Sequence, residues 1–170
     1  MSFSEPGTAA VGFLTVIEEK SHGLFGGYLI LNPAGRPVEF HCTAPVKPNR
    51  AQEILYGPTL KPYLYGEQIA RTLIQKSKIM PRMVCFDQEC VLCVRPFLST
   101  PAVLVERREE NVSESGKLRW KDQLLSPFAE FNEDLTEVQA CLKDLFIEFD
   151  LLEPFDRIRD AIAEAQKAAG

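Results

Sequence analysis

Three strand-like segments precede the first helix-forming segment of this 170-residue chain, and they constrain its fold more than any other feature. Residues 12–19, GFLTVIEE, are rich in β-branched and aromatic side chains, which is typical of a strand. Residues 26–46 contain two further runs, YLIL and VEFHCT, on either side of NPAGRP, whose Asn, Pro and Gly favour a turn. We therefore predict a strand followed by a β-hairpin.

Helices and strands alternate in the rest of the chain. Asn49 and Gln52 form a capping-box pattern at the start of a short helix, and Gly57-Pro58 ends it. A second helix follows Gly66. Further strands are expected at 82–87 and 101–107, an exposed loop at 108–123, and helices at 132–150 and from 154 onward within a C-terminal region 132–170. This order predicts an α+β fold, in which helices and a C-terminal helical pair pack on a mixed, mainly antiparallel sheet of about five strands.

Length and composition suit a single globular domain spanning residues 1–170, with 45% hydrophobic and 25% charged residues. The net charge of −5 disfavours nucleic acid as a partner without excluding it, because proteins that coat nucleic acid present a basic face. No apolar run is long enough to span a membrane. The start, MSFSEPGTAAVGF, lacks a basic segment followed by an apolar one, so we expect no secretory signal and a cytoplasmic location.

The five cysteines allow two kinds of metal site. The candidate ligands are Cys85, Cys90, Cys93 and the distant Cys141 for an iron–sulfur cluster, or Cys90 and Cys93 with His41 and Cys42 for zinc. The flanking residues, however, are apolar and strand-like and contain no glycine, which favours buried, reduced thiols. Our main prediction is therefore that the chain holds no metal and no cofactor.

The segment between the two predicted helices, GPTLKPYLYG, is unusually rich in helix breakers and aromatic residues. Such a break costs regular hydrogen bonds and would bring several aromatic and basic side chains together at an edge of the domain. The candidate binding residues are Arg50, Tyr56, Tyr63, Tyr65 and Arg71. Tyr and Arg are enriched at interface hot spots, although the same rings could instead cap the core with their hydroxyls in water.

The front half of the chain, residues 12–95, resembles the ribonuclease H-like fold in its order of elements. In that family a glycine-rich hairpin precedes a helix that carries a glutamate, and the next strand ends in an aspartate. The corresponding segments here are GGYLILNPAGRPVEF, then NRAQEIL with Glu53, then VCFDQECVL with Asp87. The resemblance implies that Asp156 or Asp160, near the C-terminus, would supply the last acidic residue.

The resemblance implies a magnesium-dependent nuclease, in which several carboxylates converge on two metal ions about 4 Å apart. One departure from the family pattern concerns the first strand, which carries an aspartate in the family. Here GFLTVIEEK offers only Glu18 and Glu19, at its far end.

Three functional hypotheses follow from these patterns. The leading one is a non-catalytic domain that acts through a protein partner or self-association, by way of the aromatic segment. The alternative is the magnesium-dependent nuclease, and the third is a zinc or iron–sulfur protein. Phosphate-binding loops of the GxxxxGK[ST] or GxGxxG type do not occur in the sequence.

The two C-terminal helices should differ in their contribution to stability. Residues 132–150 place Leu142 and Phe146 on a broad apolar face, whereas the helix from Pro154 has a thinner stripe. We therefore expect deletion of 154–170 to cost less stability than replacing Leu142 or Phe146 by Ala.

Overall fold

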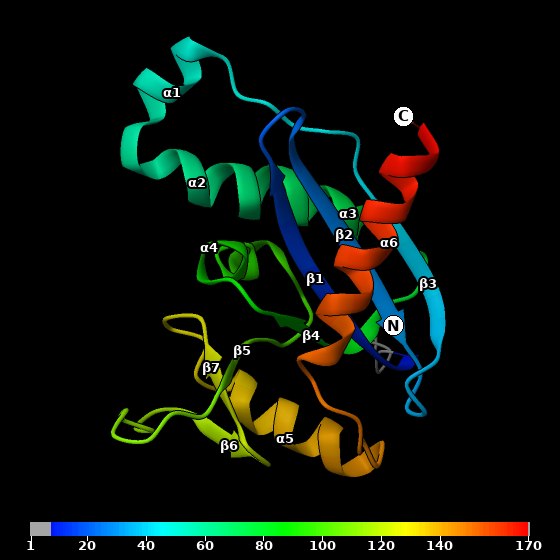
Figure 1. Cartoon of the computed structure of the whole chain (residues 1–170). Helices are drawn as coiled ribbons and strands as arrows, with labels where there is room; N and C mark the ends of the chain where they lie inside the picture. Colours follow the sequence, from blue (N-terminus) through cyan, green and yellow to red (C-terminus); the bar gives the residue numbers. More distant parts are fainter. Residues whose placement is uncertain (1–7, 170) are drawn as a thin grey trace, which may run out of the picture.

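The computed structural model describes residues 8–169, which form a seven-stranded sheet with helices on both faces (Figure 1). The strands are β1 Thr8–Glu19, β2 Gly23–Leu31, β3 Pro37–Cys42, β4 Pro81–Phe86, β5 Ala102–Arg107, β6 Leu118–Trp120 and β7 Gln123–Pro127. Their order across the sheet is β3-β2-β1-β4-β5-β7-β6, with β1–β4 and β4–β5 parallel and the other pairs antiparallel. The predicted α+β class is confirmed, with seven strands where about five were expected. Residues 1–7, where the sequence suggests no secretory signal, lie outside the described part.

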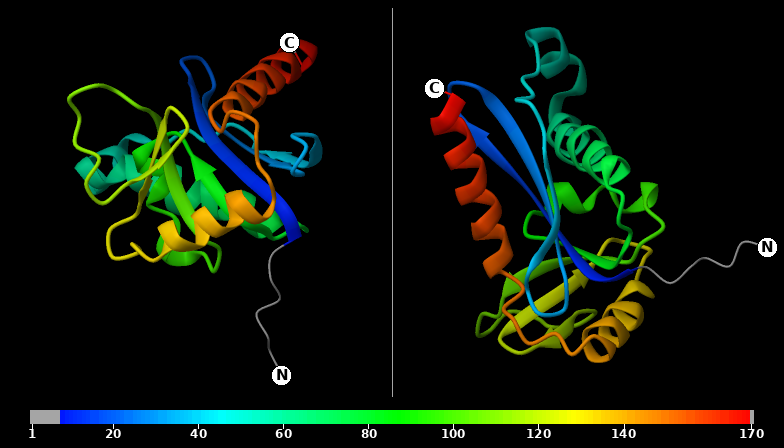
Figure 2. Two further views of the ribbon diagram at one scale, coloured as in Figure 1. Left: turned by 90° about the horizontal axis from the view of Figure 1, so that it is seen from below. Right: turned by 90° about the vertical axis from the view of Figure 1, so that its right-hand side faces the viewer.

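Helical segments cover both faces of the sheet. They are α1 Arg50–Tyr56, η1 Gly57–Thr59, α2 Leu60–Pro62, η2 Tyr63–Ala70, α3 Arg71–Lys76, α4 Glu89–Leu92, η3 Arg95–Phe97, α5 Asp134–Asp144 and α6 Glu153–Ala169. Figure 2 shows β1–β3 between α6 on one side and the α1–α3 segment on the other. Two separate apolar clusters fill these two layers. No helix within residues 8–169 combines the length and hydropathy needed to cross a membrane.

The predicted hairpin is confirmed as β2 and β3, in which Tyr28 pairs with His41. Its turn is stabilised by the side chain of Asn32, which accepts hydrogen bonds from the backbone N–H groups of Ala34 and Arg36, both at 3.0 Å. Gly35 has φ +80°, a conformation that glycine adopts at little cost. The turn residues of the sequence thus fix the hairpin.

Two adjacent glycines let helices approach both faces of β2 closely. A Cβ on Gly26 would lie 2.2 Å from Ile69 of η2, and a Cβ on Gly27 would lie 2.3 Å from Ile158 of α6. Because any side chain at these positions would push a helix away, the separation of the three layers is set partly by Gly26 and Gly27.

The helical segment from Arg50 to Lys76 differs from its prediction in the middle. The capping box of Asn49 and Gln52 is present, and α1 ends before Gly57 as expected. Gly57 takes φ +52° and ψ −130°, however, and not the left-handed helical conformation of a C′ glycine. The chain then continues through η1, α2 and the π-helical η2, where the sequence suggested an irregular connector. Pro58 starts the new helical segment at a position where a missing N–H costs nothing.

The predicted helix 132–150 ends earlier than expected. α5 stops at Asp144, where Phe146 takes φ +53° and the N–H of Ile147 donates to the carbonyl of Leu142 at 3.1 Å. This is a Schellman termination with Phe at the position usually held by glycine. Phe146 is 82% exposed, so its predicted place in the core is wrong.

The expected exposed loop at 108–123 also contains a short hairpin. Residues 108–117 are largely exposed, whereas Trp120 pairs with Gln123 across a two-residue turn. Lys121 has φ +55° in this turn. A strand of only three residues, β6, leaves little periodic pattern in the sequence.

A partly buried carboxylate, that of Glu39, ties β3 to the chain after α3. Glu39 accepts hydrogen bonds from the N–H groups of Lys78 at 2.8 Å and Ile79 at 3.0 Å, and its other contact is the His41 ring at 2.6 Å. Burial raises the pKa of Glu39, but these hydrogen bonds outweigh that effect and bring the pKa from 4.5 to about 2.

We expect Glu39→Gln to lower the melting temperature at pH 7. A depressed pKa adds stability that is complete above the unfolded value of 4.5 and disappears as the pH falls towards about 2. The difference between wild type and Glu39→Gln should therefore shrink steadily across that window, as measured by circular dichroism. Glu148→Gln, at an exposed position, is the control and should show no such trend. A difference that stays constant from pH 7 to pH 2.5 would contradict this role of the Glu39 charge.

Candidate functional site

The carboxyl ends of β1 and β4 form a topological switch point. β2 and β3 lie on one side of β1, and β4 and β5 lie on the other. In open sheets with parallel strands, ligands bind outside the carboxyl ends of the strands at such a point. The register places Leu14 opposite Phe86, so Thr15 and Asp87 are the next residues along the two strands.

Asp87 is held at this point by a contact with α6. Its side chain is 12% exposed, and Oδ2 forms an ion pair with Arg159. Oδ1 is buried and has no hydrogen-bond partner among residues 8–169. The same guanidinium lies 3.2 Å from the Oδ1 atom of Asp156, whose side chain is mostly exposed. One arginine therefore lies between two carboxylates.

The neighbouring Gln88 joins the ends of β1 and β4. Its Oε1 accepts from the Val16 N–H at 2.9 Å and from the Thr15 hydroxyl at 3.2 Å, and its Nε2 donates to the Val16 carbonyl at 2.9 Å. The side-chain amide of Gln88 thus forms hydrogen bonds to β1 just beyond the last backbone pair between β1 and β4. At this place β1 offers the hydroxyl of Thr15 and no carboxylate.

A cavity of about 400 Å³ adjoins Asp87 on the side of β5. Its charged lining residues include the cations Arg107 and Lys117. Arg107 lies 2.8 Å from Asp122 and 3.4 Å from Asp150, and this pairing with both carboxylates raises the pKa of its guanidinium. The cavity is also lined by Glu106 and Glu109, and Lys117 lies 4.0 Å from Glu106. The site therefore combines the largely buried carboxylate of Asp87 with cations that are themselves paired with carboxylates.

The structure brings together only part of the predicted carboxylate set. Asp87 and Asp156 share Arg159, as described above. Glu53 instead lies on α1, 3.2 Å from Arg50, and lines a different cavity of about 540 Å³ with Glu18. Asp160 is exposed on α6. Among residues 8–169 no group of three or more His, Cys, Asp or Glu side chains is arranged to hold a metal ion.

The predicted aromatic set does not form one surface. The rings of Tyr56 and Tyr63 stack at 4.4 Å, whereas Tyr65 is buried in the core. Arg71 lies elsewhere, with its guanidinium 4.5 Å from the centre of the Phe97 ring. Arg50 pairs with a neighbouring glutamate on α1.

The cysteines lie in several environments. Cys85 and Cys141 are buried in the layer beneath α5 and α6, and burial raises the pKa of both thiols, that of Cys141 to about 11. Cys90 and Cys93 are half-buried on and beside α4, and Cys42 is exposed on β3. All five are free thiols.

Arg159 was not singled out from the sequence, although one signal was available. It lies in FDRIRDAI, directly after Ile158, which is buried against the sheet. A long cation next to a buried position on α6 can reach the strand ends that the helix covers. The sequence offers no comparable signal for Gln88.

Comparison with known proteins supports the fold. No family model matches this sequence, and no curated protein matches it. Among solved structures, human ENDOV matches over 95% of this chain and 86% of that chain, with 14% identity and a TM-score of 0.52. Endonuclease V of Ciona intestinalis, in complex with inosine-containing DNA, matches over 64% of this chain and 49% of that chain, with 15% identity and a TM-score of 0.41. The first match supports the predicted resemblance to the ribonuclease H-like fold.

This finding corrects our leading hypothesis. A non-catalytic assembly domain that works through a protein partner or self-association is the wrong interpretation, because the matched protein is an endonuclease. The expectation that nucleic acid is a disfavoured partner is wrong for the same reason. The match agrees better with the alternative hypothesis.

Proposed function

We propose that this chain acts on nucleic acid, and that the contact is made at the carboxyl ends of β1 and β4. The observation that carries the proposal is the place of Asp87, a largely buried carboxylate paired with a cation at the switch point of the sheet. The similarity in fold to an endonuclease along 95% of the chain supports the same class of ligand.

Arg159 is the residue best placed to contact a phosphate. Its ion pair with the largely buried Asp87 fixes its position, whereas its second partner, Asp156, is mostly exposed and free to turn away. A phosphate could therefore replace Asp156 on the guanidinium, whose planar fork suits phosphate oxygens. Arg107 and Lys117 line the cavity beside Asp87 and would contact a neighbouring phosphate by exchanging their present carboxylate partners.

Cleavage of the phosphodiester backbone is the second candidate, and it is favoured by the unpartnered Oδ1 of Asp87. A two-metal mechanism would need several carboxylates around a common point. The described residues do not fit such a centre, because Thr15 contributes a hydroxyl, Arg159 brings a positive charge and Glu53 lines a different cavity. Any cleavage activity would depend on Asp87.

The proposal is tested by fluorescence anisotropy of the full chain with short labelled DNA and RNA, each single-stranded and duplex. We expect binding that weakens as salt rises, because phosphate contacts release counterions. Arg159→Ala should weaken binding by about tenfold, the effect of losing one charge-assisted hydrogen bond. The matched control is Arg36→Ala, at the hairpin turn beside the opposite end of β1, which should bind like wild type.

Two results would overturn the proposal. One is the absence of binding to all four nucleic acids at low salt, and the other is equal weakening by Arg159→Ala and Arg36→Ala. The same samples incubated with Mg²⁺ or Mn²⁺ and run on denaturing gels test the second candidate. Strand cleavage that Asp87→Asn abolishes would support it, and intact strands at saturating protein would exclude it.

A further inference from the structure

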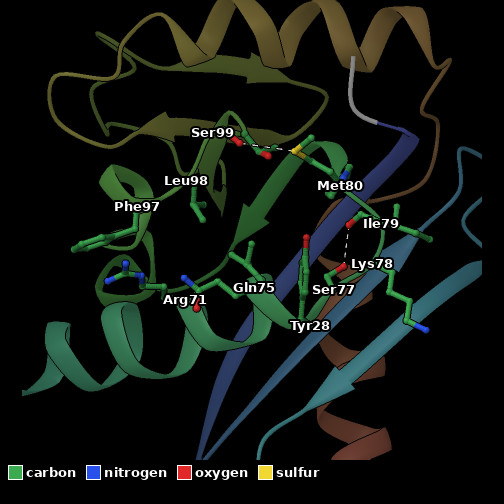
Figure 3. A pocket seen from close by; sticks show the side chains of 13 residues that line it. Tyr28, Arg71, Gln75, Ser77, Lys78, Ile79, Met80, Phe97, Leu98 and Ser99 are labelled. Atoms are coloured by element: carbon green, nitrogen blue, oxygen red, sulfur yellow. Dashed lines mark hydrogen bonds between the residues drawn. The ribbon is translucent and has the colours of Figure 1, made fainter. Parts of the chain in front are cut away.

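A further cavity lies at the opposite end of β4, where that strand begins (Figure 3). It has a volume of about 220 Å³ and is bounded by α3, by the segment that leads into β4 and by the segment between η3 and β5. Its described lining residues include two cations, Arg71 and Lys78, and no carboxylate. The cavity is smaller than those that hold drug-sized ligands, about 300–1,000 Å³.

Tyr28 lines this cavity and carries a buried hydroxyl. The ring rises from β2 and crosses β1 at Gly12, where an added Cβ would lie 2.8 Å from the hydroxyl oxygen. Tyr28 is 0% exposed, and its hydroxyl has no hydrogen-bond partner in the described part of the chain. Burial raises the pKa of this phenol, so the group remains protonated and is able to donate. A buried donor without an acceptor is destabilising, so a ligand that supplies an acceptor would remove this cost.

The mouth of the cavity carries a cation without a carboxylate partner. Arg71 lies beside the exposed ring of Phe97 and forms no ion pair within residues 8–169. Lys78 extends towards β3 in Figure 3, away from this mouth. The lining also includes the apolar side chains of Leu98 and Met80, and Gln75 lies between Arg71 and Tyr28 in Figure 3.

We propose that this cavity binds a small organic acid with a separate acceptor oxygen. The acceptor, such as a ketone, takes the hydrogen bond of Tyr28, and the carboxylate pairs with Arg71 at the mouth. The apolar body of the molecule lies against Leu98 and Met80. A carboxylate in the inner part would be unsuitable, because the neutral hydroxyl alone cannot offset the desolvation of a charge.

The probe for this site is benzoylpropionate, which has a ketone, an aromatic body and a carboxylate. Phenylbutyrate lacks the ketone, and the methyl ester of benzoylpropionate lacks the charge. Titrations of the isotopically labelled full chain followed by amide NMR should show saturable shifts at Ser77 and Ser99, which line the cavity. We expect affinity in the order benzoylpropionate, phenylbutyrate, ester.

Variants of the lining residues test which side chain contacts the ketone of the probe and which contacts its carboxylate. Tyr28→Phe should weaken benzoylpropionate about fivefold, the effect of one neutral hydrogen bond, and leave phenylbutyrate unchanged. Arg71→Gln should weaken both acids and leave the ester unchanged. Lys167→Gln, at the far end of α6, is the control and should bind all three like wild type.

Stability provides an independent readout on the free protein. Tyr28→Phe removes a buried unpaired hydroxyl, so its melting temperature without ligand should equal or exceed that of wild type. A lower melting temperature would show that the hydroxyl already has a partner. Three results would each overturn the proposal. They are a lower melting temperature of Tyr28→Phe, equal affinity of wild type and Tyr28→Phe for benzoylpropionate, and the absence of a saturable shift with any probe.

Discussion

Replacing Asp134 by Ala should lower the free energy of unfolding by about 3–5 kcal/mol, because it leaves the buried guanidinium of Arg95 without its partner. Nε of Arg95 lies 2.5 Å from Oδ2 of Asp134, and Nη2 lies 3.0 Å from Oδ1. The two side chains are only 10% and 7% exposed. This two-point contact joins η3 to the start of α5.

Both side chains make further contacts, so replacing either one alone should be destabilising. Asp134 also accepts from the N–H of Ala102 at 3.2 Å, and Arg95 donates to the carbonyl of Leu98 at 2.7 Å. The guanidinium lies 4.2 Å from the centre of the Phe131 ring. Loss of the carboxylate therefore leaves both a charge and a backbone N–H of β5 unpaired.

A double variant separates the cost of an unpaired charge from the value of the pair. Arg95→Met with Asp134→Leu replaces both charges by apolar groups and should unfold at higher urea than Asp134→Ala alone. Urea unfolding followed by circular dichroism gives both values. If the double variant is the less stable protein, the stability of this region depends on the ion pair itself rather than on the absence of an orphaned charge.

The parts of the fold that could be predicted from the sequence have local causes. The hairpin follows from Asn32 and Gly35 in its turn, and the start of α1 follows from Asn49 and Gln52. The end of α5 was missed because Phe146 takes a positive φ that a sequence pattern assigns to glycine.

The site could be predicted only in part, for a similar reason. Asp87 follows a buried apolar strand, so its place at a strand end was visible in the sequence. Its partner Arg159 is 72 residues away and reaches it only because α6 packs across β1 and β2. Glu53 does not lie near Asp87, because α1 is on the other side of the sheet (Figure 1). The local sequence of a helix does not indicate which side of the sheet the helix occupies.

Phe155→Ala should destabilise the protein by about 3–5 kcal/mol. This expected loss is opposite in sense to the sequence-based expectation that deleting residues 154–170 costs less stability than replacing Leu142 or Phe146 by Ala. Phe155 is 0% exposed, and its ring meets Phe13 of β1 edge to face at 5.6 Å. Deleting residues 154–170 should cost still more, since Ile158 also lies in this core layer and packs against Gly27.

The matched control is Phe146→Ala, which removes the same atoms at a site that is 82% exposed. It should change the free energy of unfolding by no more than about 0.5 kcal/mol. Phe146→Gly should raise stability by about 0.5–1 kcal/mol, because glycine takes the φ of +53° without strain. The urea midpoints of these variants compare directly how much the side chains of the two C-terminal segments contribute to stability. A loss for Phe155→Ala as small as that for Phe146→Ala would mean that α6 leaves the sheet in solution, and the contact between Arg159 and Asp87 would then be lost with it.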